Sequence, residues 1–593
     1  MSKRLLSPVA LLSATLLLTW CVGILGRGYW TPDEPREADL AWRMSWQAEK
    51  AVPLLAGEAF CEKPPLTYWL AAVPIGVFGA QAWAARLPNL LYAVVTAIGV
   101  GLLARRSAGT AAGLVGAAAV STFLLSYQVA IWLATDAPLL AAVSVALLGL
   151  YRGFYAADTR ERLIGYSLMH VALGLGFLCK SAVAWMVPAL ALATLAVWER
   201  RWRELFRWEL YLGLLLQAAI ILTWIWFVYL GPDGPAHLKV FFWNNLVGRF
   251  TRVDAPSELQ YAAAHRNSPG KYLLELPLYL APWTLLVIAA VRRAWLQRKS
   301  SFTGYRAVRF GVAAALPSLA ILSLAATARN VYLAPALPGV ALLLAWWARE
   351  IQQQPDPWDI RALHATSILL LLGVLLFAAI LCVIGVDGWD TMRSHADFIV
   401  ISAVGLIVAA TLALRAWRAA SPTRGRLQRA QWSLLLAYCT LLVGPASQVY
   451  SRVDTWQDLA SIARSIGKDS AGKPLILFAP DETTRAIIDM YARTDVVLIA
   501  GPIDSGAILL LRTAALAAPQ SLVVVQLPGR SPLTGRLQEL AQRLTRGSHR
   551  RGSPAQAADA ESTLSWLPDT EFRLARSYSL PNGRRYALLK FQP

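Results

Sequence analysis

Apolar residues fall into long runs over the first 450 positions of the chain. About 14 runs can be recognised, many of them roughly 17 to 23 residues long, which is the length of an α-helix that crosses a bilayer. They lie at residues 5–26, 66–80, 88–104, 110–126, 131–151, 163–179, 182–198, 210–230, 273–292, 307–326, 331–348, 364–386, 397–417 and 431–449. A single soluble domain is excluded, and the pattern predicts an all-α polytopic membrane protein.

Clusters of arginine and lysine test how many of these runs span the membrane. Short basic connections between spans lie in the cytoplasm as a rule. If the short, proline-bounded run 66–80 does not cross the membrane, all the basic clusters lie on its cytoplasmic side; they fall within 105–106, 200–207, 292–299 and 415–429. The sequence therefore predicts about 13 transmembrane helices, with the N-terminus in the cytoplasm and the C-terminus outside.

After Tyr450 the pattern changes to short strand-like runs that alternate with amphipathic helical stretches, which is typical of a small α/β domain. Strands are expected at 474–480, 495–500, 521–527 and 586–591, and helices at 458–466 and 535–544, before a polar stretch at 546–561. We therefore divide the chain into a transmembrane domain, 1–450, and a soluble periplasmic α/β domain, 451–593. The longest outward loops of the first domain are 27–87 and 231–272.

Charge, cysteine positions and the absence of a glycine-rich motif argue against several kinds of partner and site. The chain has 593 residues and a net charge of +20. In a soluble protein this charge would suggest nucleic acid, but much of the arginine and lysine here lies between apolar runs, so we expect no nucleic-acid partner. The five cysteines are scattered, which predicts neither a disulfide framework nor a thiolate metal site. The C-terminal domain has no glycine-rich phosphate loop, so a nucleotide site is not expected.

The first outward loop carries two groups of candidate residues. Asp33 and Glu34 lie in TPDEPREAD, just beyond the first span, and Glu62 and Lys63 lie in FCEKPPLTYW, where two prolines fix the chain direction. Asp136, in IWLATDAPLL, lies at the outer end of an apolar run, where an aspartate is costly unless it is hydrated or paired. Each residue alone could equally be a solvated acid, a snorkelling lysine or a helix cap.

Further candidates lie in the other outward turns: Lys180, Arg249, His265, Arg329 and Tyr332. Taken together, carboxylates and cations from several outward turns are expected to meet beside an aromatic surface, at the depth where a polyprenyl-phosphate sugar has its phosphodiester. Sugar transfer from such a carrier needs cations to stabilise the departing phosphate, and a carboxylate to orient or deprotonate the acceptor.

The motifs that hold these residues resemble those of a known family. They are DEPREAD, PLLAGEAFCEKPPLTYW, ATDAPL, GLGFLCKSAVAWMVP, the pair Arg249 and Phe250, HRNSPGKY and SLAATARNVYLAPALP. With them the chain resembles the GT-C superfamily of membrane glycosyltransferases, specifically the glycosyltransferase family 39 branch that includes bacterial aminoarabinose (lipid A) transferases and protein O-mannosyltransferases. The motifs cover most of residues 1–349 in order, and the C-terminal domain is similar to that of the aminoarabinose transferases.

The resemblance implies roles for the candidate residues. Asp33 becomes the catalytic carboxylate, with Glu34 beside it and Asp136 in the polar lining. Phosphate or substrate ligands would be Arg36, Lys63, Lys180, Arg249, Arg329 and Tyr332. Glu62 and His265 could share a divalent metal ion or a substrate contact, although the chemistry itself requires no cofactor. The chain departs from the family at Ser181 and Ala182, at Arg329, and at Asn244 and Asn245, and these positions lie in turns on the acceptor side.

The resemblance also implies a reaction and a location. We expect an inverting transferase of the bacterial inner membrane that moves a sugar, 4-amino-4-deoxy-L-arabinose, from undecaprenyl phosphate to a lipid A phosphate on the periplasmic face. A glycosyltransferase that acts on a protein or glycan hydroxyl is the closest alternative. A transporter is disfavoured because no inverted repeat is detected, and a lipid-binding scaffold without catalysis would not need Asp33.

Overall fold

The computed structural model describes residues 7–249, 268–298, 305–325, 329–387, 396–492, 494–499, 505–527 and 571–592. Close contacts divide the chain into two compact units. The helical unit comprises Met1–Gly26, Met44–Pro53 and Ala59–Tyr450, and the sheet unit comprises Arg27–Arg43, Leu54–Glu58 and Ser451–Pro593. The sheet unit therefore contains two segments of the first outward loop as well as the C-terminal part of the chain.

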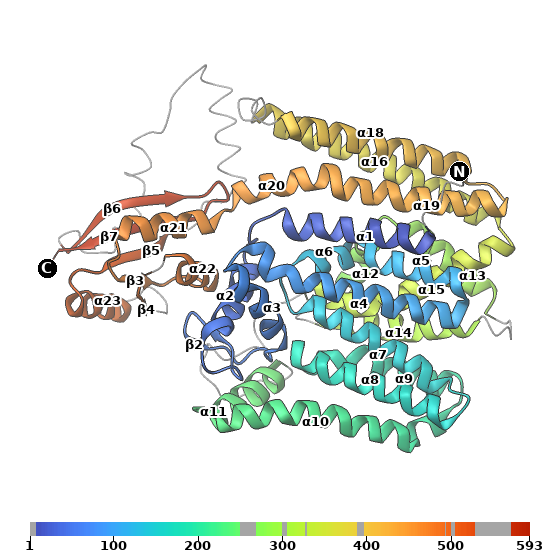
Figure 1. Cartoon of the computed structure of the whole chain (residues 1–593), viewed down its shortest axis with the longest axis horizontal. Helices are drawn as coiled ribbons and strands as arrows, with labels where there is room; N and C mark the ends of the chain where they lie inside the picture. The colour runs from blue at the N-terminus through green and yellow to red at the C-terminus, as the bar shows by residue number, and fades with distance from the viewer. Residues whose placement is uncertain are drawn as a thin grey trace. The chain divides into compact units, whose positions relative to one another are not determined.

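The helical unit consists of long apolar helices joined by short turns (Figure 1). They are α1 (Pro8–Leu25), α3 (Leu66–Phe78), α4 (Ala82–Ala108), α5 (Thr110–Thr122), α6 (Leu124–Ile131), α7 (Asp136–Phe154), α8 (Thr159–Lys180), α9 (Val183–Trp198), α10 (Trp208–Leu230), α11 (Gly234–Lys239), α12 (Lys271–Tyr279), α13 (Thr284–Leu296), α14 (Tyr305–Leu324), α15 (Leu337–Gln353), α16 (Pro357–Asp387), α18 (Ala396–Ala419) and α19 (Arg424–Leu441). Short 3-10 or π turns connect several of them: η1 (Trp202–Phe206), η2 (Val240–Leu246), η3 (Val247–Arg249), η6 (Asn330–Ala336) and η7 (Leu442–Ala446).

Within the described chain, ten helices are long and apolar enough to cross a membrane, or up to twelve if each bent pair counts as one span. The bent pairs are α5 with α6, at 66°, and α12 with α13, at 112°. The remaining helix of the 13 that the sequence predicts is α9, which has only 16 residues. It rises about 24 Å, less than the apolar core of a bilayer, about 30 Å. The chain is a multi-span membrane protein, and α3, with 13 residues, is too short to span, as expected.

The helices α7 and α8 pack unusually closely because glycines face one another. A Cβ atom on Gly165 would lie 2.3 Å from the backbone nitrogen of Gly153, and one on Gly149 would lie 2.5 Å from that of Met169. Small residues of this kind let two membrane helices approach to backbone contact. The close pairing fixes where the first residue of α7, Asp136, and the last residue of α8, Lys180, can lie.

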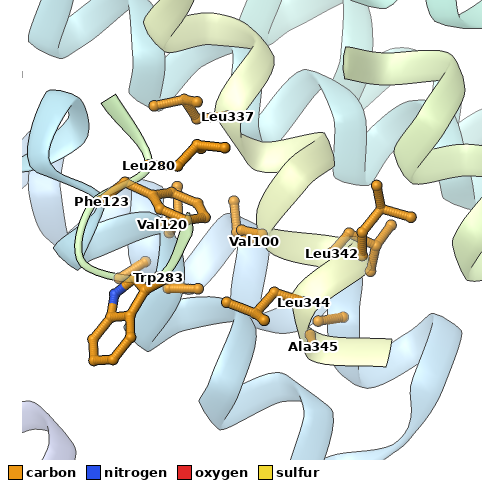
Figure 2. Packing of buried hydrophobic residues seen from close by; sticks show 14 of the residues in the cluster. Val100, Val120, Phe123, Leu280, Trp283, Leu337, Leu342, Leu344 and Ala345 are labelled. Carbon is orange, nitrogen blue, oxygen red and sulfur yellow. The ribbon is translucent and has the colours of Figure 1, made fainter. Parts of the chain in front are cut away.

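Apolar side chains fill the space between α4, α5, α13 and α15. Figure 2 shows Val100, Val120 and Phe123 meeting Trp283 and Leu344 in this core. The indole nitrogen of Trp283 donates a hydrogen bond to the Thr122 hydroxyl at 2.8 Å, so its one polar atom is satisfied within the apolar core. The bend between α12 and α13 is therefore held by packing against the neighbouring helices.

Ion pairs connect helix ends at one end of the helical unit. Arg106 of α4 contacts Glu161 of α8 at 3.0 Å, and Arg293 of α13 contacts Asp359 of α16 at 2.5 Å. Arg309 of α14 contacts Glu199, just after α9, at 3.2 Å. We call this the basic end. Because the helices alternate in direction, the turns that carry Asp136, Lys180 and η6 lie at the opposite end.

The sheet unit is built on a five-stranded mixed sheet in the order β4-β3-β5-β7-β6. The strands are β3 (Leu475–Phe478), β4 (Val496–Ile499), β5 (Leu522–Leu527), β6 (Phe572–Ser579) and β7 (Arg585–Phe591), and β1 (Leu54–Leu55) with β2 (Glu58–Ala59) forms a separate pair. Strand β3 is parallel to β4 and β5, whereas β7 is antiparallel to β5 and β6. The helices are α2 (Asp33–Trp46), which continues into the helical unit, α20 (Ser447–Trp456), α21 (Leu459–Ser470), α22 (Glu482–Tyr491) and α23 (Ser505–Ala517).

Four strands and one helix, α21, lie where the sequence pattern places them. The sequence did not predict β6, because this edge strand is largely exposed and lacks a regular alternation of apolar and polar residues. The helix expected at 535–544 and the polar stretch at 546–561 lie outside the described residues.

Candidate functional site

At the end of the helical unit opposite the basic end, Asp136 and Lys180 form an ion pair. The Lys180 Nζ atom lies 2.5 Å from Asp136 Oδ1, and the two side chains are only 12% and 8% exposed. Asp136 is in the first turn of α7 and Lys180 is in the last turn of α8. A carboxylate at a helix N-terminus and a cation at a C-terminus are both stabilised by the helix dipole, so the backbone supports the charged form of each group.

The turn η6 brings an aromatic ring and a cation next to this pair. The Lys180 Nζ atom lies 4.6 Å from the centre of the Tyr332 ring, within range of a cation–π contact. The Arg329 side chain is exposed, while its carbonyl accepts hydrogen bonds from the Tyr332 backbone at 3.0 Å and from the buried Tyr272 hydroxyl at 2.6 Å. The structure therefore brings together three of the expected residues, Asp136, Lys180 and Tyr332. Arg329 lies three positions before Tyr332 in the sequence.

Glu62 and Lys63 lie just before the prolines that start α3. The Glu62 carbonyl accepts a hydrogen bond of 2.6 Å from the buried Asn245 side chain, which fixes this turn to η2. Lys63 lines a small hollow together with Trp224 and His237. Asn245, which the sequence marked only as a departure from the family, thus has a structural role in positioning the segment around Glu62.

Two expected residues are not fully covered by the described chain. Arg249 ends η3, but its side chain lies outside the described part, and His265 lies within 250–267, outside it altogether. Among the residues that are described, no group of three or more histidine, cysteine, aspartate or glutamate side chains could hold a metal ion. The expected metal contact of Glu62 with His265 therefore stays a prediction.

In the sheet unit, Asp33 and Arg36 lie on the first turn of α2. Arg36 Nη2 is 3.6 Å from Asp33 Oδ1, and Arg36 Nη1 is 2.8 Å from Glu482 Oε2 at the start of α22. The Asp33 side chain is 17% exposed and accessible from solvent. Arg36 also lies 3.5 Å from Glu37, so three carboxylates surround this guanidinium.

Glu34 has a different environment from Asp33, although the two are neighbours in sequence. Both of its oxygens accept hydrogen bonds from the Arg27 guanidinium, at 2.7 and 2.8 Å, and one also accepts from the Trp30 backbone at 2.7 Å. The Glu34 and Arg27 side chains are completely buried. Glu34 is therefore out of reach of solvent and shapes the turn, whereas Asp33 is accessible.

The turn that carries Asp33 is also held by residues more than 400 positions later in the chain. The Asp454 carboxylate accepts hydrogen bonds from the Gly28 backbone at 2.7 Å and from the Trp30 indole at 2.6 Å. The Thr483 hydroxyl donates to the Pro32 carbonyl at 2.9 Å. We call these contacts the turn clamp. Through it, α20 and α22 determine the conformation of the segment that begins α2.

One turn farther along α2, a second pair of carboxylates is bridged by an arginine. Asp39 is completely buried and accepts a hydrogen bond from the Ala56 backbone at 2.6 Å, while Arg43 contacts both Asp39 and Asp489. Burial, and next the negative charge of Asp489, hold the pKa of Asp39 well above its ordinary value of 3.8. This group holds β1 against α2 and lies away from Asp33 along the helix.

Comparison with known proteins finds a family model and named relatives that are similar to parts of the chain. Residues 62–227 match the family described as dolichyl-phosphate-mannose-protein mannosyltransferase. A protein from Pseudomonas aeruginosa named undecaprenyl phosphate-alpha-4-amino-4-deoxy-L-arabinose arabinosyl transferase is 29% identical over 345 residues, which are 58% of this chain and 60% of the relative. A protein of the same name from Pseudomonas paraeruginosa is 28% identical over 409 residues, 68% of this chain and 71% of the relative.

A solved structure agrees over almost the whole chain. The crystal structure of ArnT from Cupriavidus metallidurans bound to undecaprenyl phosphate covers 98% of this chain and 97% of its own, with a TM-score of 0.68 at 18% identity. The chain has the GT-C fold. The resemblance to GT-C transferases that the sequence motifs indicated is therefore confirmed, and so is the fold class, a polytopic helical protein with a C-terminal sheet domain.

The GT-C fold of this chain contains functional candidates that the sequence did not reveal. Arg86 is a completely buried cation in α4, and its Nη1 lies 3.4 Å from the Ile24 carbonyl. Arg86 lies two positions before the apolar run 88–104, so the sequence pattern gave no sign that α4 begins early enough to bury it. Arg27, Asp454 and Glu482 gave no signal either, because arginine and carboxylates in outward loops are ordinary.

Proposed function

We propose that this chain transfers 4-amino-4-deoxy-L-arabinose from undecaprenyl phosphate to a phosphate of lipid A. The proposal rests on one observation: residues within the family match also lie together in the structure. The family match over 62–227 includes Lys63, Asp136 and Lys180, and the last two form a buried ion pair beside an aromatic ring. The names of the sequence relatives and the carrier bound to the ArnT structure support the same donor.

We place the reaction on the periplasmic face of the bacterial inner membrane. The basic end of the helical unit carries Arg106, Arg293 and Arg309, and positively charged connections favour the cytoplasm. The opposite end, with Asp136 and Lys180, then faces the periplasm. On this assignment the N-terminus is cytoplasmic and residues 451–593 are periplasmic.

The proposed step is an in-line displacement at the anomeric carbon of the sugar. A lipid A phosphate oxygen forms the new C–O bond while the bond from that carbon to the carrier phosphate breaks, so undecaprenyl phosphate leaves with the electron pair and the configuration inverts. Lys63 and Lys180 stabilise the charge of the leaving carrier phosphate. The acceptor phosphate is already anionic at neutral pH, so no proton has to be removed from it. Arg36 binds this phosphate, and Asp33, 3.6 Å from Arg36, positions the guanidinium.

In this scheme the Asp136–Lys180 pair is a resting state of the donor site. A carrier phosphate would accept from Lys180 and from the Tyr332 hydroxyl. Because a lysine ammonium has three donors, it can bind the phosphate and keep Asp136 as a partner, so the buried carboxylate does not lose its counterion.

The test is transfer by the purified full chain in vesicles that contain undecaprenyl-phosphate aminoarabinose and lipid A, followed by mass spectrometry of the lipid A. The wild type should add one aminoarabinose mass to lipid A. Asp33→Asn should abolish this product while the protein still binds undecaprenyl phosphate. Normal turnover by Asp33→Asn would refute the assignment of the catalytic carboxylate.

A hydroxyl of a protein or envelope glycan is a second candidate acceptor, which the description of the matching family favours. In that reaction the hydroxyl must lose its proton, so Asp33 would act as a general base. The same vesicle assay with glycan and peptide acceptors distinguishes the two. Product on a hydroxyl acceptor alone would replace the lipid A assignment.

A further inference from the structure

A cavity of about 250 Å³ lies inside the helical unit, away from Asp136 and Lys180. It is lined by side chains of α1, α5, α13, α15 and α19, including Leu12, Leu114, Ala118, Trp283 and Leu344. Most of these are apolar, so water is a poor occupant. A hydrocarbon chain matches the apolar lining of the cavity better than water does.

The cavity extends over a length that matches half a bilayer. Its lining along α5 runs from Ala111 to Thr122. Eleven steps of an α-helix rise about 16 Å, which is about half of the roughly 30 Å apolar core of a membrane. Trp283, hydrogen-bonded to Thr122, lines the deep end. The space suits a hydrocarbon chain that enters from one leaflet and ends near the middle of the membrane.

The other end of the cavity is polar and lies at the basic end of the helical unit. Arg349, Gln352, Gln353, Gln428 and Gln431 line it. The Gln352 amide donates to the Gln431 carbonyl oxygen at 3.2 Å, and the buried Gln431 Nε2 atom has no hydrogen-bond partner among the described residues. The mouth therefore offers Arg349, which also lies 3.9 Å from the Glu350 carboxylate, and one unsatisfied donor to a ligand that carries acceptor oxygens.

These observations together specify an amphiphile with an anionic head. We propose that the cavity binds an anionic phospholipid of the leaflet at the basic end, with one acyl chain along α5 and the head group at the mouth. The phosphate oxygens accept from Arg349, and an ester or phosphate oxygen accepts from Gln431 Nε2. This satisfies the buried donor, whose desolvation would otherwise be uncompensated. The site is independent of the sugar transfer proposed above.

A neighbouring hollow shows why the polar mouth matters. A space of about 430 Å³ between α1, α18 and α19 is lined by apolar side chains and by the hydroxyls of Thr15, Thr19 and Thr440. Intramembrane threonines here bond their own helix, as Thr440 does with the Leu436 carbonyl at 2.7 Å. This hollow offers a head group no charge among its described residues, so we expect only exchangeable lipid tails there.

The test is native mass spectrometry of the purified full chain titrated with phosphatidylglycerol and, separately, with phosphatidylethanolamine. The wild type should retain one phosphatidylglycerol and prefer it over phosphatidylethanolamine. Ala118→Trp, which fills the cavity, should remove this binding. Arg349→Gln should weaken it about tenfold, as expected for the loss of one charge-assisted bond. The control Val404→Trp, in the neighbouring hollow, should bind as the wild type does.

The outcomes separate the proposal from its competitors. Equal retention of phosphatidylglycerol by the wild type and Ala118→Trp would overturn the proposal. It would also be overturned if the wild type showed no preference for phosphatidylglycerol and Arg349→Gln bound this lipid as tightly as the wild type does. Undecaprenyl phosphate bound in place of phosphatidylglycerol, and displaced by Ala118→Trp, would assign the cavity to a polyprenyl lipid instead. Thermal unfolding of each variant controls for misfolding, and Arg349→Gln, at a partly exposed residue, keeps the test valid if Ala118→Trp does not fold.

Discussion

Replacing Arg27 by methionine would leave the Glu34 carboxylate buried without its counterion. The pair is completely buried and has two hydrogen bonds of 2.7 and 2.8 Å. Breaking a buried ion pair by removing one partner costs about 3 to 5 kcal/mol. This is a large part of the 5 to 15 kcal/mol by which a typical domain is stable. We therefore expect Arg27→Met to lower the Tm of the sheet unit by about 10 °C.

The assay is thermal unfolding of the full chain in detergent, with two matched variants. Glu482→Gln breaks the contact of Arg36 with a carboxylate that is 56% exposed, and such a pair is worth about 0 to 1 kcal/mol. The double variant Arg27→Met with Glu34→Leu removes both charges and should recover most of the lost stability. A Tm for Arg27→Met equal to that of Glu482→Gln would refute the structural role of Glu34.

Four further expectations concern catalysis and pH. A double-mutant cycle of Asp136→Asn and Lys180→Gln should show a coupling of about 1 to 3 kcal/mol in kcat/KM, whereas additive losses would dismiss the pair as a unit. In Asp454→Asn an amide oxygen replaces a charged acceptor in the turn clamp, so we expect a lower kcat, a slightly lower Tm and unchanged carrier binding. An unchanged kcat would show that the turn clamp has no role in catalysis. The pKa of Asp39 is higher in the folded protein than in the unfolded chain, so between pH 3.8 and the raised pKa the folded protein keeps a proton that the unfolded chain releases. The free energy of unfolding therefore falls as pH rises through this range. Asp39→Asn should flatten that part of the Tm–pH curve, and an unaltered curve would contradict it. Turnover should be unchanged in EDTA, because cationic side chains are enough to stabilise the charge of the leaving phosphate. Loss of turnover in EDTA that a divalent ion restores would instead support a metal site at Glu62.

Much of the helical unit could be predicted because the bilayer restricts what a chain can do. A helix that crosses it needs about 20 apolar residues, so spans such as α10 and α16 are visible directly in the sequence. The same reasoning singled out Asp136, since a carboxylate at a helix end in a membrane needs a partner. It could not say that Lys180 is that partner, because the pairing depends on how closely Gly149 and Gly165 let α7 and α8 approach.

The sheet unit could be predicted less well, since its decisive contacts join distant parts of the chain. Asp33 and Glu34 have identical sequence signals, yet successive positions on a helix point about 100° apart, so one side chain is buried against Arg27 and the other remains accessible. The turn clamp joins Trp30 to Asp454, a contact across 424 positions that no local pattern encodes. The burial of Asp39 against Asp489 is of the same kind.

The central claim is that Asp33 acts in aminoarabinose transfer to lipid A. The most direct measurement is mass spectrometry of lipid A and envelope glycans from cells that lack this protein, complemented with the wild type or with Asp33→Asn expressed at equal levels. We predict that aminoarabinose-modified lipid A phosphate returns with the wild type alone, while the glycans are unchanged. Modified lipid A in cells with Asp33→Asn, or a change confined to a glycan or protein, would contradict the account.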